Sequence, residues 1–141
     1  MTTEQNKLSV RRSFEEVWNQ GDMAVADMLH GENVIFHDPA TPGVKGLAAF
    51  KQMVTMYRTI FANIHFTLLD QIAEDDKVVT RWQITCTHVG EFMGIPPTHR
   101  QVTATGITID RFAGGKTVET WTNWDLLGVL QQLGALDMVG A

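Results

Sequence analysis

The sequence predicts an α+β fold in which helices pack on the concave face of a curved antiparallel sheet and leave a pocket. Three observations predict it. Helical periodicity fills the first half of the chain, long β-rich runs fill the second half, and short turns join consecutive runs. With 141 residues and 44% hydrophobic residues, the chain is expected to form a single domain over residues 1–141 around one core.

The start of the chain is expected to form two helices joined by a tight turn. Thr2 and Gln5 fit a capping box that begins the first helix, and Gly21 fits its end. Asp22 can cap the second, shorter helix, which Gly31 closes. Each helix has one apolar face, made of Leu8, Phe14, Val17 and Trp18 in the first and of Val25, Met28 and Leu29 in the second.

A short strand and a third helix follow. Residues 33–38 form a β-rich run that Pro39 stops, because proline lacks the amide hydrogen that a central strand needs. An edge strand, or one that terminates there, is expected. The ATPGVKG segment at residues 40–46 is predicted to be a loop. Helical spacing then recurs in Leu47, Phe50, Met53, Val54, Tyr57 and Phe61.

The second half of the chain is typical of a meander of long strands. Runs rich in Val, Ile, Thr, Phe and Trp predict strands at residues 64–74, 78–88, 101–112 and 117–125. Asp75-Asp76 and Gly114-Gly115 are expected as hairpin turns, and a longer loop with two prolines separates the middle strands. A last helix is expected to begin at Asp125 and to end at Gly134.

Composition excludes several classes of partner. Lys and Arg total 11 against 16 Asp and Glu, a formal net charge of -5, and basic residues do not cluster. Nucleic acid and anionic membranes bind concentrated positive charge, so neither is an expected partner. The chain lacks a long apolar run and its N-terminus lacks the apolar stretch of a signal peptide, so a cytoplasmic protein is expected.

Metal and nucleotide cofactors are not expected either. The single cysteine, Cys86, excludes an internal disulfide and a multi-thiolate metal site, and its apolar neighbours predict a buried thiol. The histidines are scattered, without the paired spacing that would place two metal ligands on one face. No glycine-rich phosphate-binding motif occurs.

The last hairpin gives an expectation about which side chains share a face. If Gly114-Gly115 are the two turn residues, directly opposite residues pair by simple counting, and such residues point to the same side of the sheet. The six residues expected on one face are Asp110 with Glu119, Thr108 with Trp121, and Gly106 with Asn123. A bulge would exchange the two faces beyond it.

Four segments together resemble a known family. They are FHDP at residues 36–39, TCTHVGEFMGIPPTHRQVTATGI at 85–107, RFAGGKTVETW at 111–121 and DLLGVLQQLGA at 125–135. In order of elements the chain resembles the nuclear transport factor 2-like (cystatin-like) cone fold, and in these motifs its SnoaL-like polyketide cyclase or ester cyclase branch. The resemblance implies a cofactor-free, homodimeric enzyme that removes a proton alpha to a carbonyl of an apolar polyketide-like or ester substrate. A non-catalytic binding domain, a hydrolase and a dehydratase of the same fold are the alternatives.

Two carboxylates are candidates for the general base. Glu119 is the first, because Trp121 two residues later would desolvate it and raise its basicity, and because the resemblance puts the catalytic carboxylate in this strand. The alternative is a surface glutamate paired with a Lys or Arg. Asp38 is the second, since ketosteroid isomerases, which this region resembles, have their base there. The alternative is a turn aspartate.

The remaining candidates would hold the substrate. His88 is expected to donate a hydrogen bond to a substrate carbonyl or enolate. The resemblance implies a further histidine in the strand before Glu119, but residues 103–110 contain none, and Thr105 or Thr108 can occupy its place. Adjacent strand residues face opposite ways, so His37 and Asp38 cannot both enter the pocket. The candidate substrate contacts are His37, Trp82, Thr108, Trp121, Asn123, Phe14, Trp18 and Tyr57.

Overall fold

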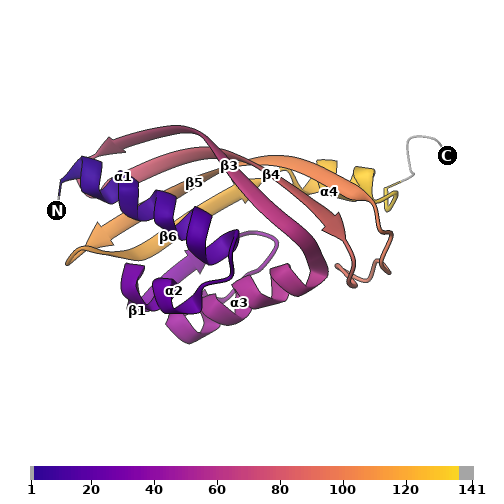
Figure 1. The fold of residues 1–141 in the computed structure, drawn as a ribbon, viewed down its shortest axis with the longest axis horizontal. Helices are drawn as coiled ribbons and strands as arrows, with labels where there is room; N and C mark the ends of the chain where they lie inside the picture. The colour runs from indigo at the N-terminus through magenta and orange to yellow at the C-terminus, as the bar shows by residue number, and fades with distance from the viewer. Residues whose placement is uncertain (1, 137–141) are drawn as a thin grey trace.

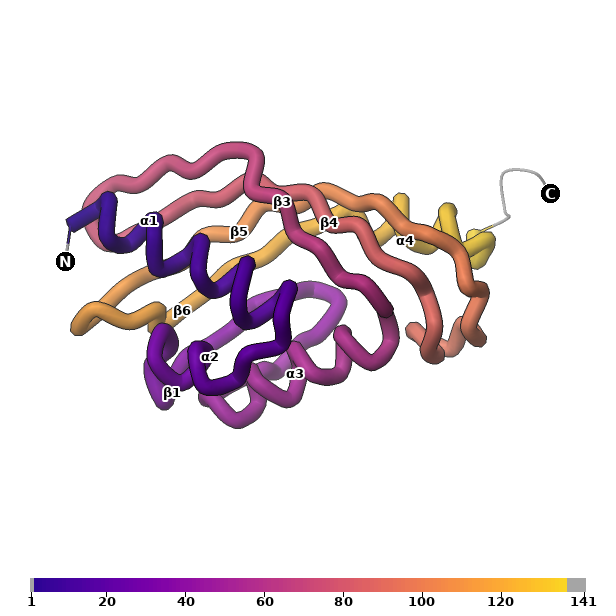
Figure 2. The backbone as a smooth tube through the Cα atoms, in the orientation of Figure 1, coloured from indigo at the N-terminus to yellow at the C-terminus, as the bar shows by residue number. Residues whose placement is uncertain are grey.

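The computed structural model describes residues 2–136 and consists of one curved, unclosed sheet with helices on its concave face (Figures 1 and 2). The predicted fold class is confirmed. The sheet has six strands in the order β2-β1-β6-β5-β4-β3. The strands are β1 (His30–His37), β2 (Val44–Lys45), β3 (Phe61–Glu74), β4 (Lys77–His88), β5 (Gln101–Ala113) and β6 (Lys116–Trp124). No helix among residues 2–136 is long and apolar enough to cross a membrane.

The first helix, α1 (Thr3–Arg12), begins at the predicted capping box. The Thr2 hydroxyl accepts from the Gln5 amide at 3.1 Å, and the Gln5 side chain accepts from the Thr2 amide at 2.9 Å. The expectation that Leu8 is buried is wrong, because its side chain is 62% exposed. Val10 is buried instead, and at 3.6 residues per turn Leu8 lies about 200° around the helix from it.

A π-helix, η1 (Ser13–Trp18), extends α1, and Phe14 and Val17 are buried there as expected. The next helix, α2 (Met23–Leu29), is capped by Asp22, whose carboxylate accepts from the Val25 amide at 3.3 Å. Met28 does not join its buried face and is 58% exposed.

The helices α3 (Leu47–Ile60) and α4 (Leu126–Gln132) contact different strands of the sheet. The helix α3 contacts β1 and β3 on the concave side, and α4 contacts β5 (Figure 1). Asp125 caps α4 as predicted, accepting from the Gly128 amide at 2.9 Å. The helices and the sheet thus enclose the apolar core.

The first strand has partners on both sides, so it is not an edge strand. The predicted 40–46 loop contains β2, which pairs antiparallel with Ile35 and Phe36 of β1. On its other side β1 pairs parallel with β6, where Phe36 is opposite Thr120. A strand inside a sheet must satisfy the backbone groups on both of its edges, and these two pairings do so. The strand still ends before Pro39, as expected.

The expected register of the last hairpin is wrong, because β6 contains a bulge. Phe112 is opposite Thr117, but Arg111 is opposite Glu119, so Val118 is an extra residue without a partner. Beyond the bulge the faces are exchanged. The side chains of Thr120, Thr122 and Trp124 therefore share a face with Asp110, while those of Glu119, Trp121 and Asn123 lie on the convex side.

The side chain of Trp82 lies over the bare backbone of Gly106, its partner in the β4–β5 pairing. A Cβ atom built on Gly106 would clash with the Trp82 indole. The indole N–H also donates to the Thr108 hydroxyl at 2.9 Å, which fixes the ring against the sheet. Glycine at this position therefore allows the tryptophan to pack flat.

We expect Gly106→Ala to displace Trp82 and to lower the free energy of unfolding by about 1–3 kcal/mol, as overpacking of a core does. Urea unfolding monitored by tryptophan fluorescence measures both effects. Gly31→Ala is the matched control, since its Cβ would meet the Val118 side chain at an ordinary 3.4 Å. Equal stability of Gly106→Ala and the wild type would contradict this account of the packing.

Candidate active site

A cavity of about 90 Å³ lies between the helices and the concave face of the sheet. That volume is several times what one water molecule occupies, which is roughly 10–15 Å³, so the cavity is larger than a packing defect. Its wall is mainly aromatic and is built by Phe14, Trp18, Phe36, Phe50, Tyr57, Phe61, Phe66, Trp82 and Trp124. Such a wall favours flat apolar molecules.

Two adjacent strands give the cavity a polar part. Five polar side chains of β5 and β6 line the cavity, those of Thr108, Asp110, Thr117, Thr120 and Thr122. The hydroxyl groups of Thr108 and Thr122 are 2.9 Å apart and hydrogen-bonded, and Thr108 also accepts from the Trp82 indole. These hydroxyls are therefore satisfied within the wall.

The Asp38 carboxyl group lies in the cavity wall, just beyond the end of β1. The indole N–H of Trp124 donates to both of its oxygens at 3.1 Å, and the Ala40 amide donates to one of them at 2.8 Å. Burial raises the pKa of Asp38, while the donors from Ala40 and Trp124 partly offset that rise because they stabilise the carboxylate. Asp38 is thus an oriented, partly desolvated carboxylate.

A second carboxyl group, that of Asp110, also lines the cavity, and the sequence did not identify it as a candidate. The Thr120 hydroxyl donates to it at 2.6 Å. Burial raises the pKa of Asp110 to about 7, and the hydrogen bond from Thr120 acts in the opposite direction. The sequence contains one signal that could have predicted the orientation of Asp110. A bulge in β6 places Arg111 opposite Glu119, and this pairing of opposite charges favours the bulged register over an unbroken one.

His30, at the start of β1, is a third group that the sequence did not single out. Its Nδ1 lies 3.2 Å from the Ala26 carbonyl oxygen, which can only accept, so Nδ1 carries the hydrogen. Its Nε2 lies 3.4 Å from the Ser13 hydroxyl, and its ring packs 4.5 Å from that of Phe50. Burial lowers the pKa of His30 to about 4, so the imidazole is neutral at pH 7.

Tyr57 and Cys86 complete the titratable groups of the cavity wall among residues 2–136. The Tyr57 hydroxyl is hydrogen-bonded to that of Thr41 at 2.6 Å. Burial raises the pKa of Tyr57 to about 12 and that of the Cys86 thiol to about 11. Both side chains therefore stay neutral at physiological pH.

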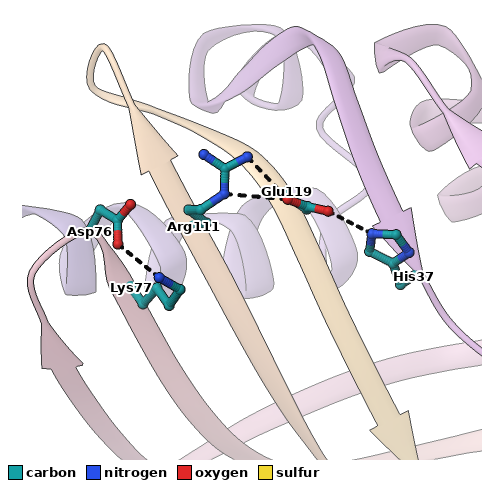
Figure 3. A network of polar contacts seen from close by, with 5 residues as sticks. All are labelled: His37, Asp76, Lys77, Arg111 and Glu119. Atoms are coloured by element: carbon teal, nitrogen blue, oxygen red, sulfur yellow. Dashed lines mark hydrogen bonds and ion pairs between the residues drawn. The ribbon is translucent and has the colours of Figure 1, made fainter.

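Glu119 lies on the convex face of the sheet, away from the cavity, in a network with its neighbours (Figure 3). Its carboxylate accepts from Arg111 at 3.0 and 3.3 Å and from His37 Nε2 at 2.8 Å. These contacts, first the one with His37, lower the pKa of Glu119. The geometry matches the alternative reading of a surface glutamate paired with an arginine.

The predicted substrate contacts divide between the two faces. His37 stacks on Trp121 at 5.4 Å on the convex side, and Asn123 is exposed there. Asp38 faces the cavity while His37 does not, as the alternation along a strand requires. The predicted contacts that do line the cavity are Phe14, Trp18, Tyr57, Trp82 and Thr108.

His88 is fully buried at the end of β4. Its Nδ1 accepts from the Thr98 amide at 3.2 Å, because a backbone N–H can only donate. In the neutral ring Nε2 then carries the hydrogen, and it has no partner among residues 2–136. His88 is not among the described residues that line the cavity, and its predicted contact with the substrate stays a prediction. No three His, Cys, Asp or Glu side chains gather as metal ligands within residues 2–136.

The chain has the nuclear transport factor 2-like fold, in which helices pack on the concave face of a curved sheet and enclose a cavity. Within that fold class, the chain belongs to the SnoaL-like polyketide cyclase family, whose sequence model matches residues 8–133. No curated protein matches the sequence.

Solved structures agree with this assignment. TsrD from Streptomyces laurentii is similar, with 26% identity, a TM-score of 0.87 and coverage of 96% of this chain and 99% of that one. A presumed polyketide cyclase from Acidithiobacillus ferrooxidans has 30% identity and a TM-score of 0.84, with coverage of 95% and 98%. IdmH from Streptomyces antibioticus, a presumed polyketide cyclase, has 28% identity and a TM-score of 0.80, with coverage of 91% of this chain and 97% of that one.

We expect Asp110 to make stability depend on pH. Its pKa is about 7 when folded and about 3.9 when unfolded, so between these values the folded state binds the extra proton. The free energy of unfolding therefore falls as pH rises through this interval, by an amount on the order of a few kcal/mol.

Urea unfolding of the wild type and of Asp110→Asn, between about pH 5 and about pH 8, measures this dependence. The difference between the two proteins isolates Asp110, because His30, whose lowered pKa acts in the opposite direction, is present in both. Parallel pH dependences of the two proteins would show that Asp110 does not titrate in this interval.

Proposed function

We propose that the protein catalyses cofactor-independent proton transfer alpha to a carbonyl group of an apolar, polyketide-like or ester small molecule, as in an intramolecular aldol ring closure or an isomerisation. The observation that carries the proposal is the Asp38 carboxylate, which is held by two N–H donors in the wall of an aromatic cavity. Family membership supports the same class of chemistry.

Asp38 is the proposed general base. A hydrogen alpha to a carbonyl is a weak acid, so its removal needs a base that water does not stabilise strongly. Burial provides this, since it raises the pKa of Asp38. The donors from Trp124 and Ala40 orient the group and stabilise its carboxylate form. A substrate that fills the aromatic cavity would exclude water, which would otherwise solvate the base and quench an enolate.

The cavity wall also accounts for substrate binding in this proposal. Rings such as those of Phe14, Phe66 and Trp82 pack together, with centroids between 4.9 and 6.4 Å apart. A flat apolar substrate would extend this stacking, and its carbonyl oxygen would turn toward the polar wall of β5 and β6. The substrate is thereby oriented with its α-hydrogen near Asp38.

We expect the wild type to accelerate exchange of the α-hydrogens of α-tetralone or ethyl benzoylacetate with deuterium from the solvent. Asp38→Asn should lower that rate by about 10²- to 10⁴-fold, the usual contribution of a positioned base. Proton NMR measures the exchange, and quenching of tryptophan fluorescence measures binding, which Asp38→Asn should retain.

Two further variants sharpen this test. Asp70→Asn removes an exposed carboxylate that pairs with Arg81, and should exchange like the wild type. Glu119→Gln compares the two candidate bases. Full activity of Glu119→Gln supports Asp38, whereas loss of exchange in Glu119→Gln but not in Asp38→Asn would assign the base to Glu119. Binding of these ketones without any exchange would support a non-catalytic binding domain.

A further inference from the structure

A second carboxyl group lines the same cavity and takes no part in the proton abstraction described above. Asp110 projects from the middle of β5, directly opposite Thr120 of β6, and is only 7% exposed. The Thr120 hydroxyl donates to it at 2.6 Å, and no other described group of residues 2–136 makes a hydrogen bond to it. No lysine or arginine of these residues lines the cavity.

The surroundings of Asp110 and Asp38 differ in the donors that each carboxyl group receives. Asp38 accepts from an indole N–H and a backbone amide, both of which stabilise the carboxylate. Asp110 is as little exposed as Asp38, at 7%, but burial raises its pKa to about 7 against a single opposing hydroxyl donor. Two carboxyl groups in one site with surroundings that affect their pKa values differently are typical of a base and acid pair.

We propose that Asp110, positioned by Thr120, is the general acid of this cavity and protonates the carbonyl oxygen of the substrate whose α-carbon Asp38 deprotonates. This inference rests on the proposed function. Asp110 would give its proton to the carbonyl oxygen, where negative charge develops in the transition state and where a donor lowers the barrier most.

The protons and electrons balance without a further reactant. Asp38 takes the α-hydrogen as a proton, and the electron pair of that C–H bond forms the C=C bond of an enol. Asp110 gives its proton to the carbonyl oxygen and becomes a carboxylate that still accepts from Thr120. In an aldol step the enol carbon bonds to a second carbonyl carbon, the enol O–H proton returns to Asp110, and the proton on Asp38 goes to the new alkoxide oxygen.

The spacing of the strands is compatible with Asp38 as the base and Asp110 as the acid. Asp38 follows β1 and Asp110 lies on β5, with β6 between them, so their strands are about 10 Å apart. A base and an acid that each contact one end of the same carbonyl unit, at about 3 Å, must stand apart with the substrate between them. The hydroxyls of Thr108 and Thr122 lie nearby but are paired with each other.

Three of the other titratable groups that face the cavity, His30, Tyr57 and Cys86, do not change their protonation state near neutral pH. The pKa of His30 is lowered to about 4, and those of Tyr57 and Cys86 are raised to about 12 and about 11. The pKa of Asp38 is also raised by burial, but two donor groups oppose that rise. A loss of rate near neutral pH would therefore report on Asp110.

The experiment compares the wild type with Asp110→Asn and Thr120→Val for α-hydrogen exchange of ethyl benzoylacetate. Asp110→Asn should bind the ester as the wild type does and lose about 10²- to 10⁴-fold in rate, together with the decline in rate above neutral pH. Thr120→Val removes a donor that stabilises the Asp110 carboxylate, so the decline in the exchange rate of this variant should move to higher pH. Asp70→Asn is the control that retains the wild-type profile.

Infrared spectroscopy provides a readout that does not depend on activity. The wild type at about pH 5.5 should show the C=O absorption of a buried carboxylic acid, which disappears at about pH 8.5 and is absent from Asp110→Asn. Thr120→Val should keep the absorption to higher pH. This second variant leaves the carboxyl in place, so the test stands even if Asp110→Asn fails to fold.

The outcomes separate this inference from the function on which it rests. Exchange by the wild type that Asp110→Asn leaves intact, or the absence of the infrared band from the wild type at low pH, would overturn the acid role and leave Asp38 as the base. Absence of exchange in the wild type would overturn the proposed function, and the acid role with it.

Discussion

One extra residue in β6 determines which side chains the cavity contains. Val118 has no partner on β5, so every residue after it has its side chain on the opposite face from the one that an unbroken ladder would give. Thr120, Thr122 and Trp124 consequently point inward. The same shift turns Glu119 outward, where it pairs with Arg111. Without the bulge neither the Thr120 hydroxyl nor the Trp124 indole would reach a buried carboxyl group.

Contacts on both faces of the sheet hold the end of β1 in place. On the convex side His37 stacks on Trp121. It also donates a hydrogen bond to Glu119 (Figure 3). On the concave side the next residue, Asp38, accepts from Trp124. Because consecutive residues of a strand face opposite ways, the surface network restrains the backbone from which the buried carboxylate projects. A hydrogen bond outside the cavity thereby contributes to the geometry inside it.

Burial of polar groups costs stability unless they are paired, and this cavity pairs most of them internally. Thr108, Thr122 and Trp82 form one such network. The two carboxyl groups differ in the donors that they receive, and that difference, more than burial alone, would divide them into base and acid. The desolvation that lowers the stability of the charged forms is the same effect that would make them reactive.

Local signals in the sequence determined the elements and much of the cavity wall. The capping residues Thr2, Asp22 and Asp125, the hairpin turns and the spacing of Phe14 and Tyr57 act over a few residues, so they can be read without the fold. The pairing of β1 with β2 and β6, and the bulge at Val118, depend on contacts between segments far apart in the chain. A shift of one residue in a strand exchanges its faces, so only the tertiary structure could decide that Asp38 and Asp110 face the cavity and that Glu119 does not.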